Sequence, residues 1–360
     1  MLTPLDLPGV AFAARIDDAA SGLRAFLVLD DETLGPAAGG VRTWRYASDN
    51  AALADARALA SAMTEKCALA GLDAGGGKCV VVEHAGLDRA RAFAVLGAAV
   101  ESLGGRFRTA GDLGTSAGDL AVMAAQTRFV ERDEAGLAAA VARGLVACVR
   151  ACVAERGGTA GGGGAWAAGR GGTAGGGGLR VLVQGAGAIG GAVAVALARA
   201  GAVVLVADVD GARARSVAEA TGGRVVPAED SLLAEVDVVA PCAVGGVITE
   251  AVAARLTAWA VCGAANRVLA DSNGDGDGAA HALAARGILH VPDSLASAGA
   301  VIEGIGASVM GLADRTPLID ALGDTAYAVL AEARRTGRLP VVIARERARA
   351  RIAAAQAHRT

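Results

Sequence analysis

The stretch LRVLVQGAGAIGG, residues 179–191, predicts the fold of the second half of the chain. Its apolar run leads into the pattern GxGxxG, formed by Gly185, Gly187 and Gly190. In a strand–turn–helix unit of this kind the first glycine permits a tight turn, and the second lets the backbone approach a pyrophosphate. The third lets the helix pack closely on the strand, and the helix N-terminus favours the bound anion. The stretch therefore predicts a dinucleotide site, with an ordinary tight turn as the alternative.

A second apolar strand, AVVLVADVD at residues 202–210, supports this interpretation because it contains Asp208 near its end. A carboxylate at this place accepts hydrogen bonds from the adenosine ribose and repels a 2′-phosphate, which favours NAD over NADP. Further apolar strands, among them DVVAPC and ILHVPD, alternate with helical segments. Such alternation is typical of a parallel sheet with helices on both faces, so we expect an α/β protein with a Rossmann-type domain.

The length and the charge of the chain limit its class. With 360 residues it is long enough for two domains, because single cores stop growing near ~250–300 residues. Its 34 Lys and Arg residues nearly balance its 37 Asp and Glu residues, which argues against a nucleic-acid-binding or membrane-binding surface. The segment MLTPLDLPGVAFAARIDD lacks the pattern of a secretory signal, and glycines interrupt the uncharged span 181–198. We therefore expect a soluble, cytoplasmic protein.

The cysteines and histidines are scattered. The six cysteines include no CxxC pair, and the four histidines are also far apart. A zinc site needs such ligands at close and regular spacing. We therefore expect no metal site, and reduced thiols that are buried.

The first half contains another glycine-rich stretch, AGLDAGGGKCVV at residues 70–81. A P-loop requires a glycine six positions before its lysine and a Ser or Thr directly after it. Around Lys78 those positions hold Leu72 and Cys79, so the stretch is not a phosphate-binding loop. Apolar residues at helical spacing predict a helix over residues 51–70, and KCVVVE predicts a buried strand that begins after the glycines.

Residues 157–178 contain the segment GGTAGGGG twice. Glycine at this density loses too much backbone freedom to form a regular helix or strand, so we expect a flexible surface loop. Helical patterns precede it at residues 135–155 and return at residues 318–360.

Five segments are more specific. Together they resemble the Glu/Leu/Phe/Val dehydrogenase family, most closely its leucine and valine dehydrogenases and next its phenylalanine dehydrogenases. The segments are GPAAGGVRTW (35–44), AMTEKCALAGLDAGGGKCVV (62–81), TAGDLGTSAGDL (109–120), APCAVGGVI (240–248) and CGAAN (262–266).

The resemblance implies roles for residues of the first half. Lys78 matches the catalytic base, and Asp112 matches the aspartate that contacts the reacting amino group. A free lysine has a pKa of about 10.4, so a lysine base needs a desolvated site or a neighbouring cation in order to lose its proton. Lys66 matches the lysine that binds the substrate α-carboxylate. The further substrate-binding positions are Gly40, Met63 and Asn266.

In the second half the resemblance implies that NAD is the cofactor. It places the binding residues at the glycine pattern and at the ends of three later strands. These residues are Gly185, Gly187, Ala188, Ile189, Gly190, Asp208, Cys242, Ala243, Ala264 and Asn266.

The implied activity is the reversible oxidative deamination of a small apolar L-amino acid to a 2-oxo acid and ammonia. Leucine, valine or isoleucine is favoured because nothing polar offers itself to a second carboxylate, and phenylalanine is the alternative. The resemblance implies a substrate-binding and oligomerisation domain at residues 1–135, joined by C-terminal helices at 326–360. It implies a Rossmann NAD-binding domain at residues 136–325, and a homo-oligomer.

Departures from the family pattern support a hypothesis of another class, a catalytically weak or inactive NAD(H)-binding relative. Val141 stands where the family has Thr, and Arg267 follows Asn266 where the family has a second Asn. Ser297 and Ala300 replace the outer residues of an Asn-Ala-Gly-Gly segment. Both lysines and the aspartate are kept, which favours the enzyme.

Overall fold

The computed structural model describes residues 1–157, 178–270 and 278–358. Apart from its two end residues, the predicted glycine-rich loop 157–178 lies outside this description. The chain forms two compact units. Unit 1 is Met1–Glu134, Gly304–Ala313 and Ala348–Thr360, and unit 2 is Ala135–Glu303 and Asp314–Arg347.

This division differs from the predicted one near the C-terminus. The prediction assigned residues 326–360 to the first domain, but residues 326–347 belong to unit 2. The physical reason is that α11 (Thr316–Thr336) packs along α4 (Leu137–Glu155) of unit 2. Only the end of α12 (Pro340–Ala357) returns to unit 1, together with part of α10 (Gly299–Met310).

Unit 1 is built on a mixed sheet with the strand order β1-β2-β3-β5-β4-β6. The first four strands in this order pair with one another in antiparallel fashion, and β4 runs parallel to both β5 and β6. The strands are β1 Leu2–Pro4, β2 Phe12–Asp18, β3 Leu23–Asp31, β4 Ala37–Trp44, β5 Gly75–Val82 and β6 Phe107–Gly111. The helices wholly within unit 1 are α1 Asp49–Leu69, α2 Arg89–Ser102 and α3 Ala117–Ala124.

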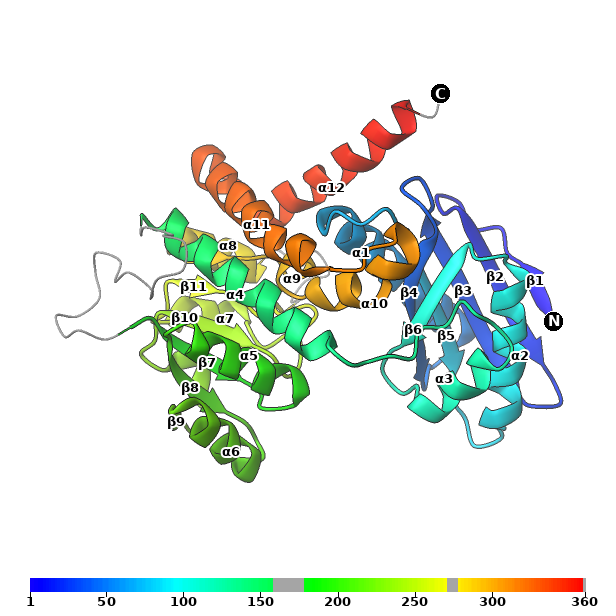
Figure 1. The fold of residues 1–360 in the computed structure, drawn as a ribbon, viewed down its shortest axis with the longest axis horizontal. Coiled ribbons are helices and arrows are strands. Elements are labelled where there is room, and N and C mark those ends of the chain that lie inside the picture. The colour runs from blue at the N-terminus through cyan, green and yellow to red at the C-terminus, as the bar shows by residue number, and fades with distance from the viewer. Residues whose placement is uncertain (158–177, 271–277, 359–360) are drawn as a thin grey trace. The chain divides into compact units, whose positions relative to one another are not determined.

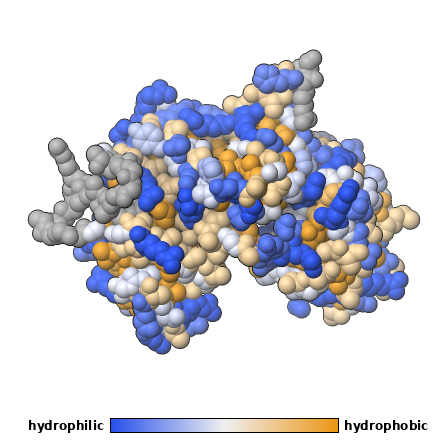
Figure 2. Space-filling view, viewed as in Figure 1, coloured by the Kyte–Doolittle hydropathy of each residue, from blue (hydrophilic) through white to orange (hydrophobic). Residues whose placement is uncertain are grey.

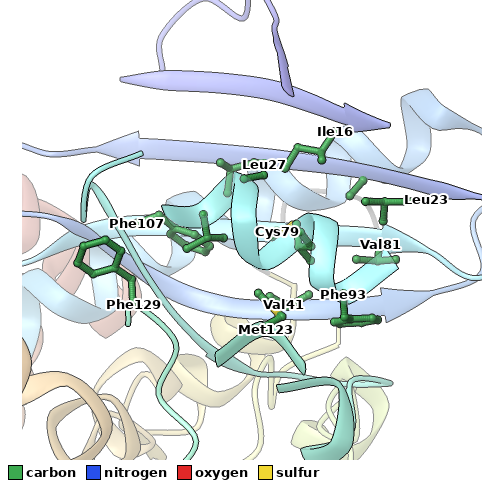
Figure 3. Close-up of a cluster of buried hydrophobic side chains, with 14 of the residues drawn as sticks. Ile16, Leu23, Leu27, Val41, Cys79, Val81, Phe93, Phe107, Met123 and Phe129 are labelled. Carbon is green, nitrogen blue, oxygen red and sulfur yellow. The ribbon is translucent and has the colours of Figure 1, made fainter. Parts of the chain in front are cut away.

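Helices cover both faces of this sheet (Figure 1). On one face α1 packs on β3 and β5. On the other, Phe93 of α2 and Met123 of α3 belong to the same buried cluster as Cys79 and Val81 of β5 (Figure 3). Because successive residues of a strand point to opposite faces, Lys78 lies on the α1 face of β5.

α1 confirms the helix predicted over residues 51–70, and small residues bring it close to the sheet. Ala52, Ala56 and Ala60 recur at every fourth position and are fully buried in the cluster on this face. Residues four apart lie on one side of a helix, so these alanines form a narrow strip against β3 and β5. Ser48 caps the helix N-terminus, where its side chain accepts a hydrogen bond from the Ala51 N–H.

The three glycines before the lysine lie inside β5, so the strand begins earlier than the sequence indicated. A Cβ on Gly75 would lie 1.7 Å from the carbonyl oxygen of Asp31, and one on Gly76 would lie 2.1 Å from the backbone nitrogen of Thr64 in α1. A Cβ on the third glycine would lie 2.9 Å from the ring of Phe107. The glycines therefore allow α1 and the neighbouring strands to pack against β5.

Unit 2 confirms the predicted α/β fold with a Rossmann-type sheet. Its strands are all parallel, in the order β12-β11-β10-β7-β8-β9. This is a doubly wound order, which reverses between β7 and β10. The strands are β7 Arg180–Gln184, β8 Val203–Ala207, β9 Arg224–Val225, β10 Val238–Pro241, β11 Ala260–Val261 and β12 Leu289–His290. The remaining helices are α5 Ala188–Arg199, α6 Gly211–Thr221, α7 Glu250–Arg255, α8 Gly278–Ala285, α9 Asp293–Ala296 and the short 3-10 helix Ser231–Leu233.

Within the described residues one helix, α4, is long and apolar enough to cross a membrane by length and composition alone. It packs against α11 and α5 of its own unit. Leu145, Cys148, Val149 and Cys152 of α4 are among its buried residues. Burial inside the unit accounts for its apolar composition.

Hydrophilic and apolar residues are interspersed on the visible surface of each unit (Figure 2). α12 contributes the exposed residues Arg345, Arg347 and Arg349, of which Arg347 pairs with Glu332 of α11. The predicted helical tail is confirmed, and these three arginines lie on its solvated face, whereas Arg351 donates to the Leu72 carbonyl oxygen at 2.7 Å.

Candidate active site

Lys78 and Asp112 meet on the α1 face of the unit 1 sheet. Lys78 lies in the middle of β5, and Asp112 directly follows β6. Lys78 Nζ is 2.7 Å from Asp112 Oδ2, and 7% of the Lys78 side chain is exposed. The pKa of Lys78 is lowered, with burial as the largest cause and the attraction of Asp112 opposing it. A buried lysine with a lowered pKa can release and regain a proton, as a general base must.

The carboxylate of Asp112 stays charged in this setting. Burial raises its pKa, but the neighbouring positive charges of Lys78 and Arg42 outweigh burial and hold the pKa below its usual range. The negative charge beside Lys78 is therefore permanent near neutral pH. It can hold a protonated amine, whether that of Lys78 or that of a substrate.

Arg42 of β4 connects this pair to α1, and the sequence analysis did not identify it. Its Nε donates to Asp112 Oδ2 at 2.9 Å, and its Nη1 donates to Asp55 Oδ2 at 3.3 Å. Tyr46 OH donates to the same Asp55 oxygen at 2.5 Å. A signal for Arg42 was present, because a residue two positions after Gly40 points to the same face of the strand. For Asp55 no such signal exists, because only the packing of α1 brings it to β4.

The substrate-binding residues predicted in unit 1 lie on β4 and α1. A Cβ on Gly40 would lie 2.9 Å from the Cβ of Asp112, so Gly40 is a direct neighbour of the pair. Met63 of α1 is half-buried, and its Cγ lies 3.6 Å from the Cβ position of Gly39. Lys66 is also half-buried and lies one helical turn beyond Met63, on the same side of α1.

The glycine pattern of unit 2 forms the turn between β7 and α5. Gly185 has a φ of +102°, a conformation that side chains rarely adopt, and its Cβ would lie 2.7 Å from that of Ala243. A Cβ on Gly190 would lie 1.9 Å from the Gly185 carbonyl oxygen. Gly187, at the start of α5, has no atom within 4 Å of its Cβ position. The first and third glycines allow close packing, and the second leaves open space at the N-terminus of the helix.

This helix start suits an anion. Ala188 and Ile189 are its first residues, and their N–H groups have no partner within the helix. The helix dipole adds partial positive charge at the same end. A pyrophosphate can therefore approach the backbone where Gly187 has no side chain.

Asp208 follows β8 beside this turn. Its Oδ2 accepts a hydrogen bond from the Ala186 N–H at 2.6 Å, and its Oδ1 accepts one from the Asp210 N–H at 2.8 Å. The bond from Ala186 is the main cause of a lowered pKa at Asp208. A charged carboxylate thus lies next to the first residues of the glycine turn.

The predicted residues after β10 and β11 lie at the same carboxyl edge. The Cys242 N–H donates to the carbonyl oxygen of Gln184, the last residue of β7, at 2.7 Å. Burial raises the pKa of Cys242 to about 12, against a hydrogen bond from the backbone of Ala264. Ala243 contacts Gly185, as described above. These residues meet where the strand order reverses, which is where open α/β sheets bind ligands.

Asn266 and the unusual Arg267 follow β11. Asn266 is exposed, and its carbonyl oxygen lies 2.2 Å from the Cβ position of Gly245. Arg267 has a φ of 53° and is the one non-glycine residue with positive φ in the described ranges. Its N–H donates to Asp293 Oδ2 at 2.9 Å. Asn adopts this conformation more readily than Arg, so the departure from Asn-Asn adds backbone strain here.

The other departures fall on the interior of unit 2. Val141 is buried in α4. Ser297 is buried, and its Oγ donates to the Asp293 carbonyl oxygen at 2.6 Å.

The predicted site residues therefore gather in two groups. In unit 1 Gly40 lies beside the pair of Lys78 and Asp112, and in unit 2 Asp208 and Ala243 lie beside the glycine turn. Across the described ranges, no group of three or more His, Cys, Asp or Glu residues is placed to hold a metal ion.

Comparison with known proteins matches a part of each unit. The dimerisation domain of Glu/Leu/Phe/Val dehydrogenases matches residues 9–129, and the Glutamate/Leucine/Phenylalanine/Valine dehydrogenase domain matches residues 212–305. A valine dehydrogenase of Streptomyces albus is 35% identical over 95% of this chain and 92% of its own length. A leucine dehydrogenase of Bacillus cereus is 32% identical over 93% of this chain and 89% of its own length.

A solved structure agrees with the sequence relatives. The crystal structure of L-tryptophan dehydrogenase from Nostoc punctiforme superimposes with a TM-score of 0.82 at 29% identity, over 97% of each chain. A phenylalanine dehydrogenase of Lysinibacillus sphaericus is 33% identical over 80% of this chain and 74% of its own length.

Proposed function

This chain belongs to the Glu/Leu/Phe/Val dehydrogenase family and is an amino acid dehydrogenase, and we propose that it catalyses the NAD-dependent, reversible oxidative deamination of a branched aliphatic L-amino acid. The products are the 2-oxo acid and ammonia. The single observation that carries this proposal is the pair of Lys78 and Asp112, in which a buried lysine lies 2.7 Å from a charged carboxylate.

The pair supplies proton transfer. In its neutral form Lys78 Nζ removes a proton from the water that attacks the imine carbon of the substrate. Asp112 Oδ2 accepts hydrogen bonds from the reacting amino group and holds the protonated lysine after the transfer. The lowered pKa of Lys78 makes its neutral form accessible well below the pH at which a free lysine loses its proton.

Two further residues of unit 1 orient the substrate in this proposal. Lys66 pairs with the α-carboxylate, because an ammonium group on α1 gives the amino acid a charged partner. A Cβ on Gly40 would lie 2.8 Å from the Gly111 carbonyl oxygen, so the glycine lets Asp112 pack close to the backbone that would anchor the substrate.

The residues of unit 2 fit a dinucleotide. The open Gly187 position and the N-terminus of α5 would hold the pyrophosphate, and Asp208 would hold the adenosine ribose. A bound NAD supplies the acceptor for the hydride that leaves the substrate Cα. The charge of Asp208 supports NAD over NADP, because a 2′-phosphate would be repelled.

The choice of substrate follows the relatives that match most of the chain. A valine dehydrogenase and a leucine dehydrogenase match 95% and 93% of it, whereas another leucine dehydrogenase matches 79% and a phenylalanine dehydrogenase matches 80%. Phenylalanine is therefore the second candidate. The match of a dimerisation domain to residues 9–129 supports a homo-oligomer. Six free cysteines, five of them buried, support a reducing cytoplasmic location.

The experiment that tests this proposal measures NADH absorbance at alkaline pH with NAD and L-valine, L-leucine, L-isoleucine, L-phenylalanine, L-alanine or L-glutamate. Turnover that is fastest with a branched aliphatic substrate is the expected result. A preference for phenylalanine would change the proposed substrate class from branched aliphatic to aromatic amino acids. Folded protein that binds NADH but turns over none of the six would contradict the catalytic proposal and favour an inactive relative.

A further inference from the structure

The geometry points to Arg42 as a positioning residue of the reaction, which holds the Asp112 carboxylate against Lys78 and is itself held by Asp55 of α1, to which Tyr46 also donates. This inference rests on the proposed function, because it concerns the base of that reaction. Nothing in the motifs that identify the family requires Arg42, Asp55 and Tyr46 to form one connected group.

The contacts form a continuous chain from β6 to α1. Asp112 Oδ2 lies 2.7 Å from Lys78 Nζ and 2.9 Å from Arg42 Nε, and it forms ion pairs with both groups. The far end of the same guanidinium reaches Asp55 Oδ2 at 3.3 Å, where Tyr46 OH also donates. The planar guanidinium has donors at both ends in fixed positions, so it can hold the two carboxylates at a fixed separation.

The network is partly removed from water. The Arg42, Asp55 and Asp112 side chains are 22%, 26% and 24% exposed. Ion pairs at this depth are screened less than pairs on the open surface, which contribute little. A displacement of Arg42 would therefore change both the position of Asp112 and the electrostatic potential at Lys78.

The charges around Lys78 give Arg42 a defined effect on protonation. Burial lowers the pKa of Lys78 most, Asp112 raises it, Arg42 lowers it, and Asp55 raises it. Arg42 thus favours the neutral lysine that a base requires. Asp55 acts in the opposite direction, although it anchors the same guanidinium.

Charged groups come from each element packed against Lys78. β4 supplies Arg42, the segment after β6 supplies Asp112, and α1 supplies Asp55. On β3, Val28 pairs with Lys78, and Asp30 near the end of that strand accepts a hydrogen bond from Thr64 Oγ1 at 2.6 Å. The pH profile is therefore the readout that separates Arg42 from a merely structural residue.

Three variants test the inference. Arg42→Met removes the positive charge and the two-ended guanidinium, and we expect the limb of the kcat/KM profile that reports Lys78 to move to higher pH. Arg42→Lys keeps the charge but cannot reach both carboxylates, so kcat should fall about tenfold while the limb stays near that of the wild type. Asp55→Asn removes a negative charge that raises the pKa of Lys78, so the same limb of the kcat/KM profile should move slightly to lower pH.

Arg15→Met is the matched control. Arg15 of β2 also connects two carboxylates, Asp17 and Asp49, and Asp49 belongs to α1 as Asp55 does. Its loss removes a comparable link between sheet and helix, but without contact to Lys78. In Arg15→Met, the limb of the kcat/KM profile that reports Lys78 should therefore stay at its wild-type pH.

A second measurement does not depend on turnover. Cyanate reacts with the neutral amine, so the rate of Lys78 carbamoylation against pH, followed by peptide mass spectrometry, reports its protonation directly. A shift of this pH dependence to higher pH in Arg42→Met and to lower pH in Asp55→Asn supports the inference. It does so even if the wild type lacks dehydrogenase activity, a result that would overturn the proposed function alone. Unchanged profiles in folded Arg42→Met and Asp55→Asn, or equal movement in Arg15→Met, would overturn the role of Arg42.

Discussion

Unit 1 and unit 2 each contain three glycines beside a proposed site, and the two sets differ in what lies opposite them. In β5 all three glycines face protein atoms at distances that exclude a Cβ. In the turn after β7 only the first and third are enclosed, and the second, Gly187, faces open space. The glycines of unit 1 therefore form a packing surface, and those of unit 2 combine packing with an opening.

The difference shows that a glycine pattern has no fixed meaning. Before Lys78 the glycine-rich stretch resembles a phosphate-binding loop but lacks the residues that such a loop requires. The neighbours that the structure shows are α1, β3 and the Phe107 ring. These neighbours bury β5, and that burial is what lowers the pKa of Lys78. The packing glycines thus contribute to chemistry indirectly, through desolvation.

The largest effect is expected at the residue that the packed glycines bury. Lys78→Ala removes the proposed base, so kcat should fall by about 10²–10⁴-fold, the usual contribution of general acid–base catalysis. NADH binding should not change, because the glycine turn belongs to unit 2. Stopped-flow or steady-state absorbance measures kcat, and fluorescence titration measures the binding of NADH. Turnover at the wild-type rate in Lys78→Ala would remove Lys78 from the mechanism.

The next effect concerns the packing itself. In Gly76→Ala the new Cβ would lie 2.1 Å from the Thr64 nitrogen and 2.3 Å from the Ala60 carbonyl oxygen, so α1 must move away from β5. Overpacking of this kind costs about 1–3 kcal/mol, and contact with backbone places this case at the upper end. Chemical denaturation should show the loss in the free energy of unfolding. A stability equal to that of the wild type would mean that α1 can shift without cost.

The sequence predicted the fold well where its signals are local. The strand β7, the glycine turn and Asp208 follow one another in 30 residues, and their geometry matches the prediction because each contact joins near neighbours in the chain. The helix of residues 51–70 was predicted from apolar spacing and is confirmed as α1. The family roles of Lys78 and Asp112 remain proposals, although the structure brings their charged groups together.

The sequence failed where a contact depends on packing between distant elements. The start of β5 was placed too late because glycine is a poor strand former, and only the approach of α1 requires three of them. Asp55 was missed because no pattern links a residue of α1 to Arg42 on β4. The assignment of α11 to unit 2 rests on its packing along α4, which no periodicity reveals.

A smaller effect is expected at the open glycine. Gly187→Ala adds a Cβ with no atom within 4 Å, at a φ of −71° that alanine adopts freely. The free energy of unfolding should therefore stay within about 0.5 kcal/mol. The Kd for NADH should rise about tenfold, equivalent to ~1.4 kcal/mol, because the methyl group blocks the approach of the pyrophosphate.

A matched control separates space from backbone strain. Gly222 also has no atom within 4 Å of its Cβ position, but its φ is +64° at the end of α6. Gly222→Ala should lower stability by about 1 kcal/mol and leave the Kd unchanged. Equal Kd values for wild type and Gly187→Ala would contradict the interpretation of the opening as a binding site.

The smallest effect is expected in the preference between cofactors. Asp208→Asn keeps an oxygen that can accept the hydrogen bond from the Ala186 N–H but removes the charge, so the turn should persist while repulsion of a 2′-phosphate disappears. The ratio of kcat/KM for NAD to that for NADP should fall by less than tenfold, mainly through better use of NADP, because the site is open to solvent and screened by salt. Asp210→Asn is the control: its side chain caps α6 through the Ala212 and Arg213 N–H groups, so it should change stability and not preference. If Asp208→Asn leaves the ratio unchanged, Asp208 shapes the turn without selecting the cofactor, and the open glycine site of unit 2 recognises the pyrophosphate alone.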